Sequence, residues 1–422
     1  ALFVLLYVIG SKWDERGRHF HALFQFQLMG IMGAFLTGDL FNLFVFFEVL
    51  LIASYGLMIH AGGTPRLRAG VQYVLYNLLG STLFLFALGA IYAETGTLNM
   101  ADLAQRVALI DTGATVGIRI AAVLLLMVFA VKAAVVPLHF WLPSSYAEAP
   151  GPVAALFAIM TKVGAYAIIR VYTLIFPPDL AATADLHTTW LLPAALLSLA
   201  LGMIGVLAAK QLDRMVAFGS MGMVMISIAL FTPEGIAAAL YYIVHSTLAA
   251  GALFLIADLA RAGRDNLDLT AQPQVAGAKL TSALFFVAAI AMVGVPPLSG
   301  FLGKLLIMDA AAENDYWVWI WAVILGASLL SLVGFGRAGS VVFWKSRSIA
   351  PEEGGNPTEA HSALSYVAVG GLLALLVAHT LLAGPATQYA TAISNQLFGP
   401  ERYLSTVLET PGKLSDGKEE AH

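Results

Sequence analysis

Long apolar stretches dominate this chain of 422 residues, of which 59% are hydrophobic and only 11% charged. Soluble domains carry about 25% charged residues, whereas a helix needs about 20 mostly apolar residues to span a bilayer. Apolar stretches of that kind lie at 20–37, 39–61, 68–93, 117–147, 151–176, 188–208, 213–231, 235–260, 279–310, 317–345 and 361–383. Ala1–Gly10 is apolar but too short, so we interpret it as the end of a further helix. The sequence therefore predicts an all-α polytopic membrane protein.

Composition excludes several functional classes. The net charge of −4 includes no polybasic footprint, which argues against a nucleic-acid partner. The absence of cysteine removes thiol catalysis, zinc–thiolate sites, iron–sulfur clusters and disulfides. No Walker loop, dinucleotide fingerprint or suitably placed pair of haem-ligating histidines occurs either. We therefore expect no cofactor and no metal.

Two of the stretches, 117–147 and 279–310, are too long for one straight helix. Each contains prolines near its middle, namely Pro137 and Pro143 in the first and Pro296-Pro297 in the second. Broken helices are tolerated in membranes only where the freed backbone is buried or lines a wet cavity. They also recur at transport sites.

The basic residues predict the orientation of the chain. Alternating the spans places thirteen loop Lys and Arg residues on one side and three on the other. The larger set is Lys12, Arg16, Arg18, Arg66, Arg68, Lys210, Arg214, Arg261, Arg264, Lys279, Arg337, Lys345 and Arg347. The smaller set is Arg106, Arg119 and Arg170. By the positive-inside rule the larger set faces the cytoplasm, which puts the tail 384–422 on the opposite side.

Five ionisable residues lie near the middle of the predicted spans: Glu48, Lys132, Lys162, His245 and Lys304. Three of them lie about 13–18 Å from the ends of their spans at 1.5 Å per residue. The other two, Lys132 and Lys304, flank the proline breaks. An intramembrane charge costs at least ~2.5–3.5 kcal/mol, so a set of five indicates function.

The chemistry of this set suits a proton relay. Burial weakens the preference of a lysine for its charged form, and an opposing carboxylate restores it. A change in the separation of Glu48 and Lys132 would therefore switch the lysine between holding and releasing a proton. Histidine titrates near neutral pH, so His245 suits an intermediate stop. It is equally compatible with a core histidine bonded to the hydroxyl of Ser246 or Thr247.

Two further residues are candidates for an auxiliary proton path. His139 lies beside the break at Pro137, where it is either a relay member or a structural cap. Glu148 lies in the turn before 151–176, where it is either a solvated loop residue or part of a cytoplasmic proton entrance.

Two carboxylates have simpler interpretations. Asp39 begins a span, where the expected role is a helix N-cap. Asp258 lies near the end of a span, and we expect a surface ion pair with Arg261 or Arg264.

Three sequence blocks resemble a known family. They are GDLFNLFVFFEV from Gly38, VKAAVVPLHFWLP from Val131 (followed by Glu148-Ala149-Pro150 and Lys162), and GVPPLSGFLGK from Gly294. Together they resemble the antiporter-like subunits shared by respiratory complex I and the Mrp multisubunit cation/proton antiporters, and most closely the D-type subunits of the latter. The complex I subunit that most resembles this sequence usually carries glutamate where this chain has Lys304, which argues against that subunit.

This resemblance implies about fourteen spans with two inverted five-helix repeats, each containing a broken helix. The repeats correspond to 20–176 and 188–345, followed by a last transmembrane helix at 361–383 and the tail 384–422. About twelve spans are present, with 1–19 as the end of a helix and a loop, so we expect a truncated or misannotated N-terminus.

The resemblance also implies a function. The expected protein is a proton-translocating subunit of a multisubunit Na⁺/H⁺ antiporter in the bacterial inner membrane, with subunits A, B, C, E, F and G and lipids as partners. Glu48 and Lys132 match an ion pair, Lys162 the central lysine, His245 a linking histidine, and Lys304 the lysine of the outer half-channel. The alternatives are a pumping subunit of a respiratory or hydrogenase complex, a stand-alone carrier of an organic solute, and a structural scaffold.

Overall fold

A computed structural model describes residues 1–110, 115–181, 183, 186–218, 221–261, 266–273, 277–349 and 361–409, with the backbone alone at 186–188. Within these residues the secondary structure is helical, and β-pairing is limited to isolated bridges joining Asp39 to Asn99 and Gln211 to Asp268. The predicted all-α fold is confirmed.

We refer to the helices before residue 176 as the first set and to those after it as the second set. The first set is α1 (Leu2–Ser11), η1 (Asp14–Arg16), α2 (Phe20–Leu36), α3 (Leu40–Met58), α4 (Thr64–Thr95), α5 (Met100–Ala108), α6 (Val116–Lys132), α7 (Trp141–Glu148), α8 (Gly151–Phe157) and α9 (Met160–Leu174). The second set is α10 (Leu186–Ala208), α11 (Leu212–Ala217), α12 (Met221–Ala229), α13 (Pro233–Arg261), α14 (Ala278–Val293), α15 (Ser299–Ala310), α16 (Trp317–Gly339), η3 (Ser340–Trp344), η4 (Lys345–Ser348), α17 (Ala363–Leu381), α18 (Ala383–Phe398) and α19 (Glu401–Glu409).

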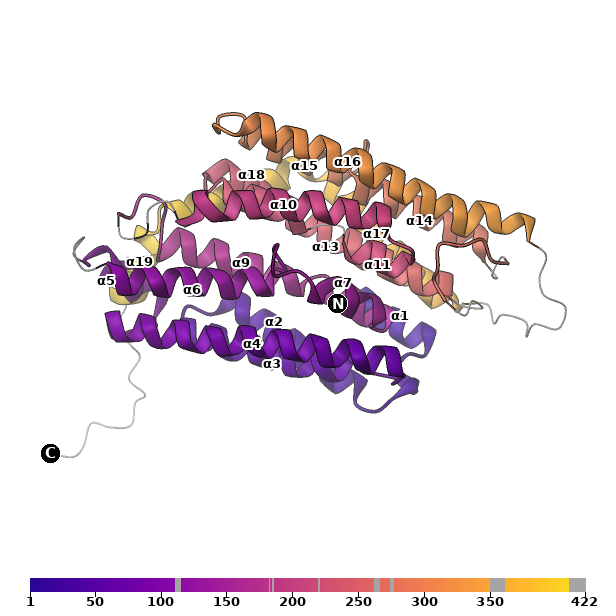
Figure 1. The fold of residues 1–422 in the computed structure, drawn as a ribbon, viewed down its shortest axis with the longest axis horizontal. Helices are drawn as coiled ribbons and strands as arrows, with labels where there is room; N and C mark the ends of the chain where they lie inside the picture. The colour runs from indigo at the N-terminus through magenta and orange to yellow at the C-terminus, as the bar shows by residue number, and fades with distance from the viewer. Residues whose placement is uncertain are drawn as a thin grey trace.

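Most helices run along one common direction, which is horizontal in Figure 1. The first set forms the lower part of that view, with α3 and α4 at its edge, and α16 lies at the opposite edge. The long helix α13 lies inside, where it packs against α8, α12, α14, α15, α17 and α18. Most side chains of α13 are therefore buried within the protein.

In the described part, 8 helical segments are long and apolar enough to cross a membrane. They account for eight of the twelve expected spans. The other four are α1, the 17-residue α2, and the two predicted to contain breaks. Both breaks are observed, between α6 and α7 and between α14 and α15. Proline lacks the backbone N–H that would continue a helix, which explains their positions.

The segment that follows the last span also contains helices. α18 is tied to the start of α13 by Ser394 Oγ, which donates to the Pro233 carbonyl at 2.7 Å. After α18, the ring of Tyr403 lies 4.4 Å from the Arg170 guanidinium. Residues 410–422 of this tail, like Arg264, lie outside the described residues.

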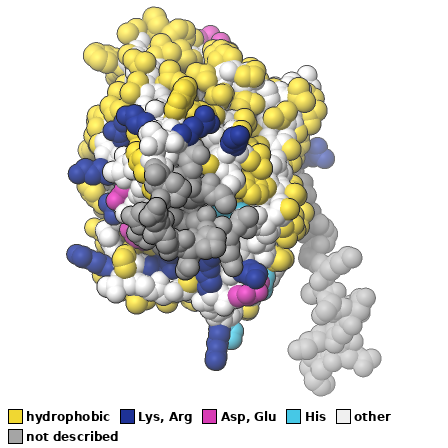
Figure 2. All heavy atoms as spheres, turned by 90° about the vertical axis from the view of Figure 1, so that its right-hand side faces the viewer, with side chains coloured by type: hydrophobic (Ala, Val, Ile, Leu, Met, Phe, Trp, Pro, Cys, Tyr) yellow, Lys and Arg dark blue, Asp and Glu magenta, His cyan; other side chains and the backbone are white. Residues whose placement is uncertain are grey.

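Basic side chains gather at one end of the molecule. Figure 2 looks onto the end opposite to α5 and α19, and Lys and Arg side chains surround its centre. Lys12, Arg16, Arg66 and Arg261 line one cavity at that end. We refer to this end as the basic end. Its charge follows the distribution that the positive-inside count predicts.

Candidate functional site

Lys132 is the last residue of α6, so its side chain emerges where the helix breaks. The residue is 5% exposed, and its amine donates to the Asn77 carbonyl at 3.3 Å and to Ser81 Oγ at 3.2 Å, both on α4. The ring of Phe47 lies 5.9 Å from the amine. Two neutral acceptors and an aromatic face therefore hold this lysine.

Glu48 lies in the middle of α3, one residue from Phe47. Its Oε1 is buried and has no hydrogen-bond partner among the described residues. The carboxylate is within electrostatic range of Lys132, but no ion pair joins the two side chains. In this structure Glu48 therefore acts on Lys132 through its charge and not through a contact, because the Lys132 amine donates to α4.

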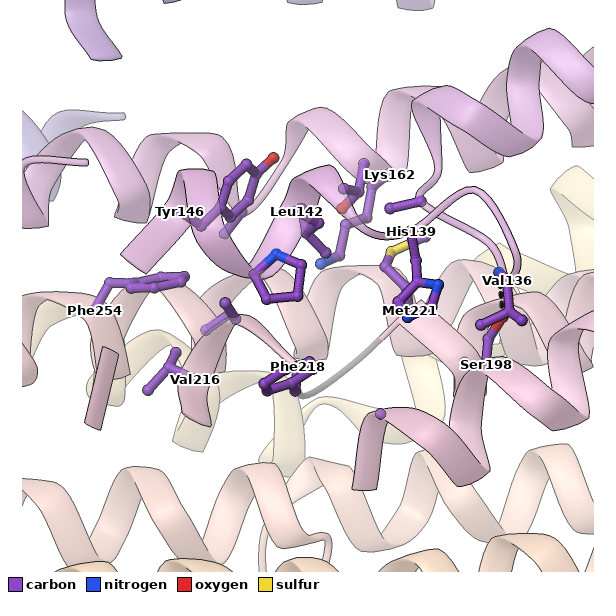
Figure 3. A pocket seen from close by; sticks show the side chains of 18 residues that line it. Val136, His139, Leu142, Tyr146, Lys162, Ser198, Val216, Phe218, Met221 and Phe254 are labelled. Carbon is purple, nitrogen blue, oxygen red and sulfur yellow. Dashed lines mark hydrogen bonds between the residues drawn. The ribbon is translucent and has the colours of Figure 1, made fainter. Parts of the chain in front are cut away.

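Lys162 lies in the first turn of α9 and is 2% exposed. It lines a cavity together with His139, Ser198 and Phe218 (Figure 3). The break that carries His139 is fixed to α10 by the Val136 N–H, which donates to Ser198 Oγ at 2.9 Å. The Nδ1 of His139 is buried without a hydrogen-bond partner in the described chain. The structure thus brings Lys162 and His139 to one cavity.

The helices that carry Lys132 and Lys162 touch at a glycine. A Cβ added to Gly164 of α9 would lie 2.7 Å from the backbone nitrogen of Ala133, the residue after Lys132. Only glycine allows this approach, because real Cβ atoms do not come closer than about 3.0 Å to other heavy atoms. The second lysine is therefore held next to the α6 break.

His245 lies in the middle of α13 and is fully buried. Its Nδ1 is 2.9 Å from Ser299 Oγ, at the first residue of α15. Its Nε2 is buried, and the ring also interacts with the Ala291 carbonyl of α14. The ring is within electrostatic range of Lys162, Lys304 and a further histidine, His379. His245 is therefore bonded to a hydroxyl, as the interpretation as a core histidine predicts. The hydroxyl is not that of Ser246 or Thr247, because both of these donate to the Ile243 carbonyl.

Lys304 lies in α15 and is 8% exposed. Its amine donates to the carbonyl of Val293 at 2.5 Å and to Ser328 Oγ of α16 at 2.6 Å. Val293 is the last residue of α14, so the amine caps a helix C-terminus, where positive charge is favoured. Gly294 follows with φ of 70°, and a Cβ there would lie 2.7 Å from Lys304 Cε. The backbone of the break at Gly294 therefore packs directly against the Lys304 side chain.

Glu148 ends α7 at the basic end of the molecule. Its Oε1 lies 3.7 Å from Arg214 Nη2, and its carbonyl accepts a 2.9 Å bond from Arg66 Nε. Glu148 is thus part of a partly exposed ion-pair network rather than a loop residue in bulk solvent.

The structure confirms the predicted role of Asp39 but not the predicted partner of Asp258. Asp39 Oδ1 accepts from the Asn42 N–H at 2.9 Å, which confirms the helix N-cap. Asp258 accepts from Tyr7 at 2.9 Å and from Trp13 at 2.8 Å. The expected ion pair of Asp258 with Arg261 is wrong, because Arg261 instead binds another carboxylate, Asp213, at 2.7 Å. The other expected partner, Arg264, lies outside the described residues.

Sequence reasoning missed the polar partners of the buried charges. Asn77, Ser81, Ser299 and Ser328 are common polar residues in apolar stretches, and no spacing rule singles them out. It also missed His379, which lies near the end of its span and therefore did not stand out by depth. Among the described residues, no group of three or more His, Cys, Asp or Glu side chains could hold a metal ion.

Residues 37–331 match the family model described as NADH:quinone oxidoreductase/Mrp antiporter, TM. This match covers both broken helices and all five ionisable residues that the sequence places near the middle of the spans. The chain belongs to this family. The antiporter-like family is also the one that the three sequence blocks resemble.

Individual proteins of this family are similar to the chain over most of its length. The chain is 39% identical to the D-type subunit of the Na(+)/H(+) antiporter of Bacillus subtilis (strain 168), over 97% of this chain and 82% of that protein. It is 36% identical to the D-type subunit of a probable K(+)/H(+) antiporter of Rhizobium meliloti (strain 1021), over 95% and 79%. A chain in the structure of the Mrp complex from Dietzia sp. DQ12-45-1b superposes with a TM-score of 0.85, at 26% identity, over 96% of this chain and 83% of that one.

Proposed function

We propose that this protein is a proton-translocating subunit of a multisubunit monovalent cation/proton antiporter in the bacterial cell membrane. The named relatives and the membrane-spanning helices support this assignment. Exchange of H⁺ for Na⁺ is driven by the proton-motive force, without ATP or redox chemistry in this chain. The expected partners are subunits A, B, C, E, F and G of such a complex.

What supports the proposal is that the ionisable groups lie on helices that touch or within electrostatic range of one another. The α6 break with Lys132 abuts α9, which carries Lys162. His245 on α13 is within electrostatic range of both Lys162 and Lys304. A purely structural role would pair each lysine with a carboxylate, whereas the amines of Lys132 and Lys304 donate to carbonyl and hydroxyl oxygens instead.

Protons pass between these groups through water. Each amine and the imidazole accepts a proton from one side and releases it to the other, because neutral amines and imidazoles retain an acceptor lone pair. Side chains alone cannot bridge about 30 Å of hydrocarbon. Glu48 acts on Lys132 through its charge. His139 and Glu148 serve the entrance, since His139 lines the cavity of Lys162 and Glu148 lies at the basic end.

The test is Na⁺-dependent antiport by the assembled complex with Lys132→Ala or Glu48→Ala in this subunit. We expect antiport in inverted membrane vesicles to be abolished for Lys132→Ala and strongly reduced for Glu48→Ala. Lys279→Ala, an exposed lysine outside the pathway, is the matched control. Wild-type antiport from either test variant, at normal assembly, rejects the mechanism.

A second candidate follows from the family itself, whose description also includes NADH:quinone oxidoreductase. In that case the chain would be a proton-pumping membrane subunit of a respiratory enzyme. Co-purification with iron–sulfur subunits would support this function. Sodium-sensitive growth of a deletion strain would support the antiporter function instead.

A further inference from the structure

A second pair of ionisable rings lies beside His245 and has no place in the pathway above. Tyr241 of α13 and His379 of α17 stack with their ring centroids 4.2 Å apart and an interplanar angle of 26°. His379 Nε2 lies 3.3 Å from the Tyr241 carbonyl, which can only accept. The Nε2 atom is therefore the donor, and Nδ1 is the proton-accepting atom of the neutral ring.

Packing alone does not account for the tyrosine. Tyr241 is 2% exposed, and its hydroxyl is buried without a hydrogen-bond partner among the described residues. Buried hydroxyls nearly always have a protein or water partner. A phenylalanine would stack on His379 equally well, so the hydroxyl indicates a water or a transferred proton.

The pair is connected to the buried relay. Tyr241 lies one helical turn from His245 on α13, and residues four apart share a helix face. His379 is within electrostatic range of His245. A Cβ on Gly303, the neighbour of Lys304, would lie 3.5 Å from Tyr241 Cδ1. The rings therefore lie beside the helix that carries Lys304.

The pair is also connected to the surface. Tyr241 lines a mostly apolar groove between α13, α15, α16 and the start of α18, and Asp309 and Thr387 are the polar residues among its other lining side chains. Asp309 is an exposed residue near the end of α15. Tyr241 lies about 12 Å from the start of α13. Arg261, at the other end of α13, lines the cavity at the basic end, so the groove lies in the opposite half of the molecule, which is the extracytoplasmic half by the positive-inside rule.

We propose that Tyr241 and His379 form the outward connection of the relay, carrying protons between the His245–Lys304 region and the groove at Asp309. The proposal rests on the proposed function. A proton arriving from the groove through water binds His379 Nδ1 and leaves that same atom to a water next to the Tyr241 hydroxyl. The hydroxyl oxygen accepts this proton as the hydroxyl releases its own toward the His245–Lys304 region. Asp309 raises the local concentration of cations at the mouth of the groove.

The test compares two variants of the assembled complex in membrane vesicles. Tyr241→Phe removes only the hydroxyl, and His379→Gln retains a hydrogen-bond donor but cannot titrate. We expect each to lower the maximal rate of Na⁺-dependent proton exchange at least about tenfold, with the apparent affinity for Na⁺ unchanged. The matched control is His361→Gln, whose histidine bonds the Leu259 carbonyl at 2.8 Å at the basic end; we expect it to match wild type.

Lys304→Ala in the same preparation separates this proposal from the proposed function. If Lys304→Ala abolishes exchange while Tyr241→Phe or His379→Gln retains the wild-type rate, the outward connection is wrong and the relay stands. If Lys304→Ala also retains the wild-type rate, the proposed function fails.

Discussion

The amines of Lys132 and Lys304 are held in the same way, each by one main-chain carbonyl and one serine hydroxyl. Neither forms an ion pair with a carboxylate of the described residues. Carbonyl and hydroxyl oxygens accept from both an ammonium and a neutral amine, because the neutral amine retains N–H groups. Both protonation states therefore keep their hydrogen bonds, as a residue that loads and releases protons requires.

Removal of one of these acceptors is expected to impair transport without removing the lysine. Ser328→Ala leaves the Lys304 amine with the Val293 carbonyl alone. A hydrogen bond to a charged group contributes about 1.5–3 kcal/mol, so we expect antiport to fall roughly tenfold or more. Ser331→Ala is the control, since Ser331 donates to the Ser328 carbonyl rather than to Lys304. Equal rates for the two variants would contradict this role of Ser328.

Depth along the predicted spans was enough to find the buried charges but not their partners. Lys132, Lys162, His245 and Lys304 are all less than 9% exposed, as predicted. The partner of His245 was expected among its sequence neighbours. Consecutive residues on a helix point in different directions, and the hydroxyl in contact belongs to Ser299, which is 54 positions away. Such long-range pairs depend on helix packing, which a single sequence does not specify.

At the scale of helices, the two breaks position the site. Each break ends a helix next to a buried lysine, at Lys132 in α6 and at Val293 in α14. Proline explains where the helices stop, and this part was predictable from the sequence. The close approach of α9 to the first break was not predictable, because it depends on Gly164 meeting a backbone segment more than 30 residues earlier.

Gly164→Ala is expected to destabilise the first half of the protein. The new Cβ would lie 2.7 Å from the Ala133 nitrogen and push α9 away from the break. Overpacking of this kind costs about 1–3 kcal/mol, and thermal unfolding of the solubilised complex measures it as a lower midpoint. Gly89→Ala, where the added Cβ meets nothing within 4 Å, serves for comparison. A midpoint for Gly164→Ala as high as that of Gly89→Ala would disprove this contact.

At the scale of the whole molecule, charge segregation defines two ends. The end in Figure 2 carries the gathered Lys and Arg side chains, and α5, α18 and α19 lie toward the other end. The sequence count predicted this separation because it depends only on the order of the spans. It did not predict α18 and α19, since these helices lie beyond the last long apolar stretch.

The orientation can be measured directly because the chain has no cysteine. Lys279→Cys and Arg119→Cys place single thiols at exposed positions on opposite ends. A membrane-impermeant maleimide should label Lys279→Cys in inverted vesicles and Arg119→Cys in intact cells. The unmodified protein should remain unlabelled, and the reverse labelling pattern would overturn the orientation.

The most direct test of the account is the antiport rate of the assembled complex with Lys162→Met. In the proposed pathway Lys162 joins the first half to His245, with which it interacts electrostatically. Methionine retains an unbranched, mostly apolar side chain while removing the amine. The account predicts normal assembly with Na⁺/H⁺ exchange abolished, and wild-type exchange from the Lys279→Met control. Wild-type exchange from an assembled Lys162→Met complex would contradict a proton pathway through these buried residues.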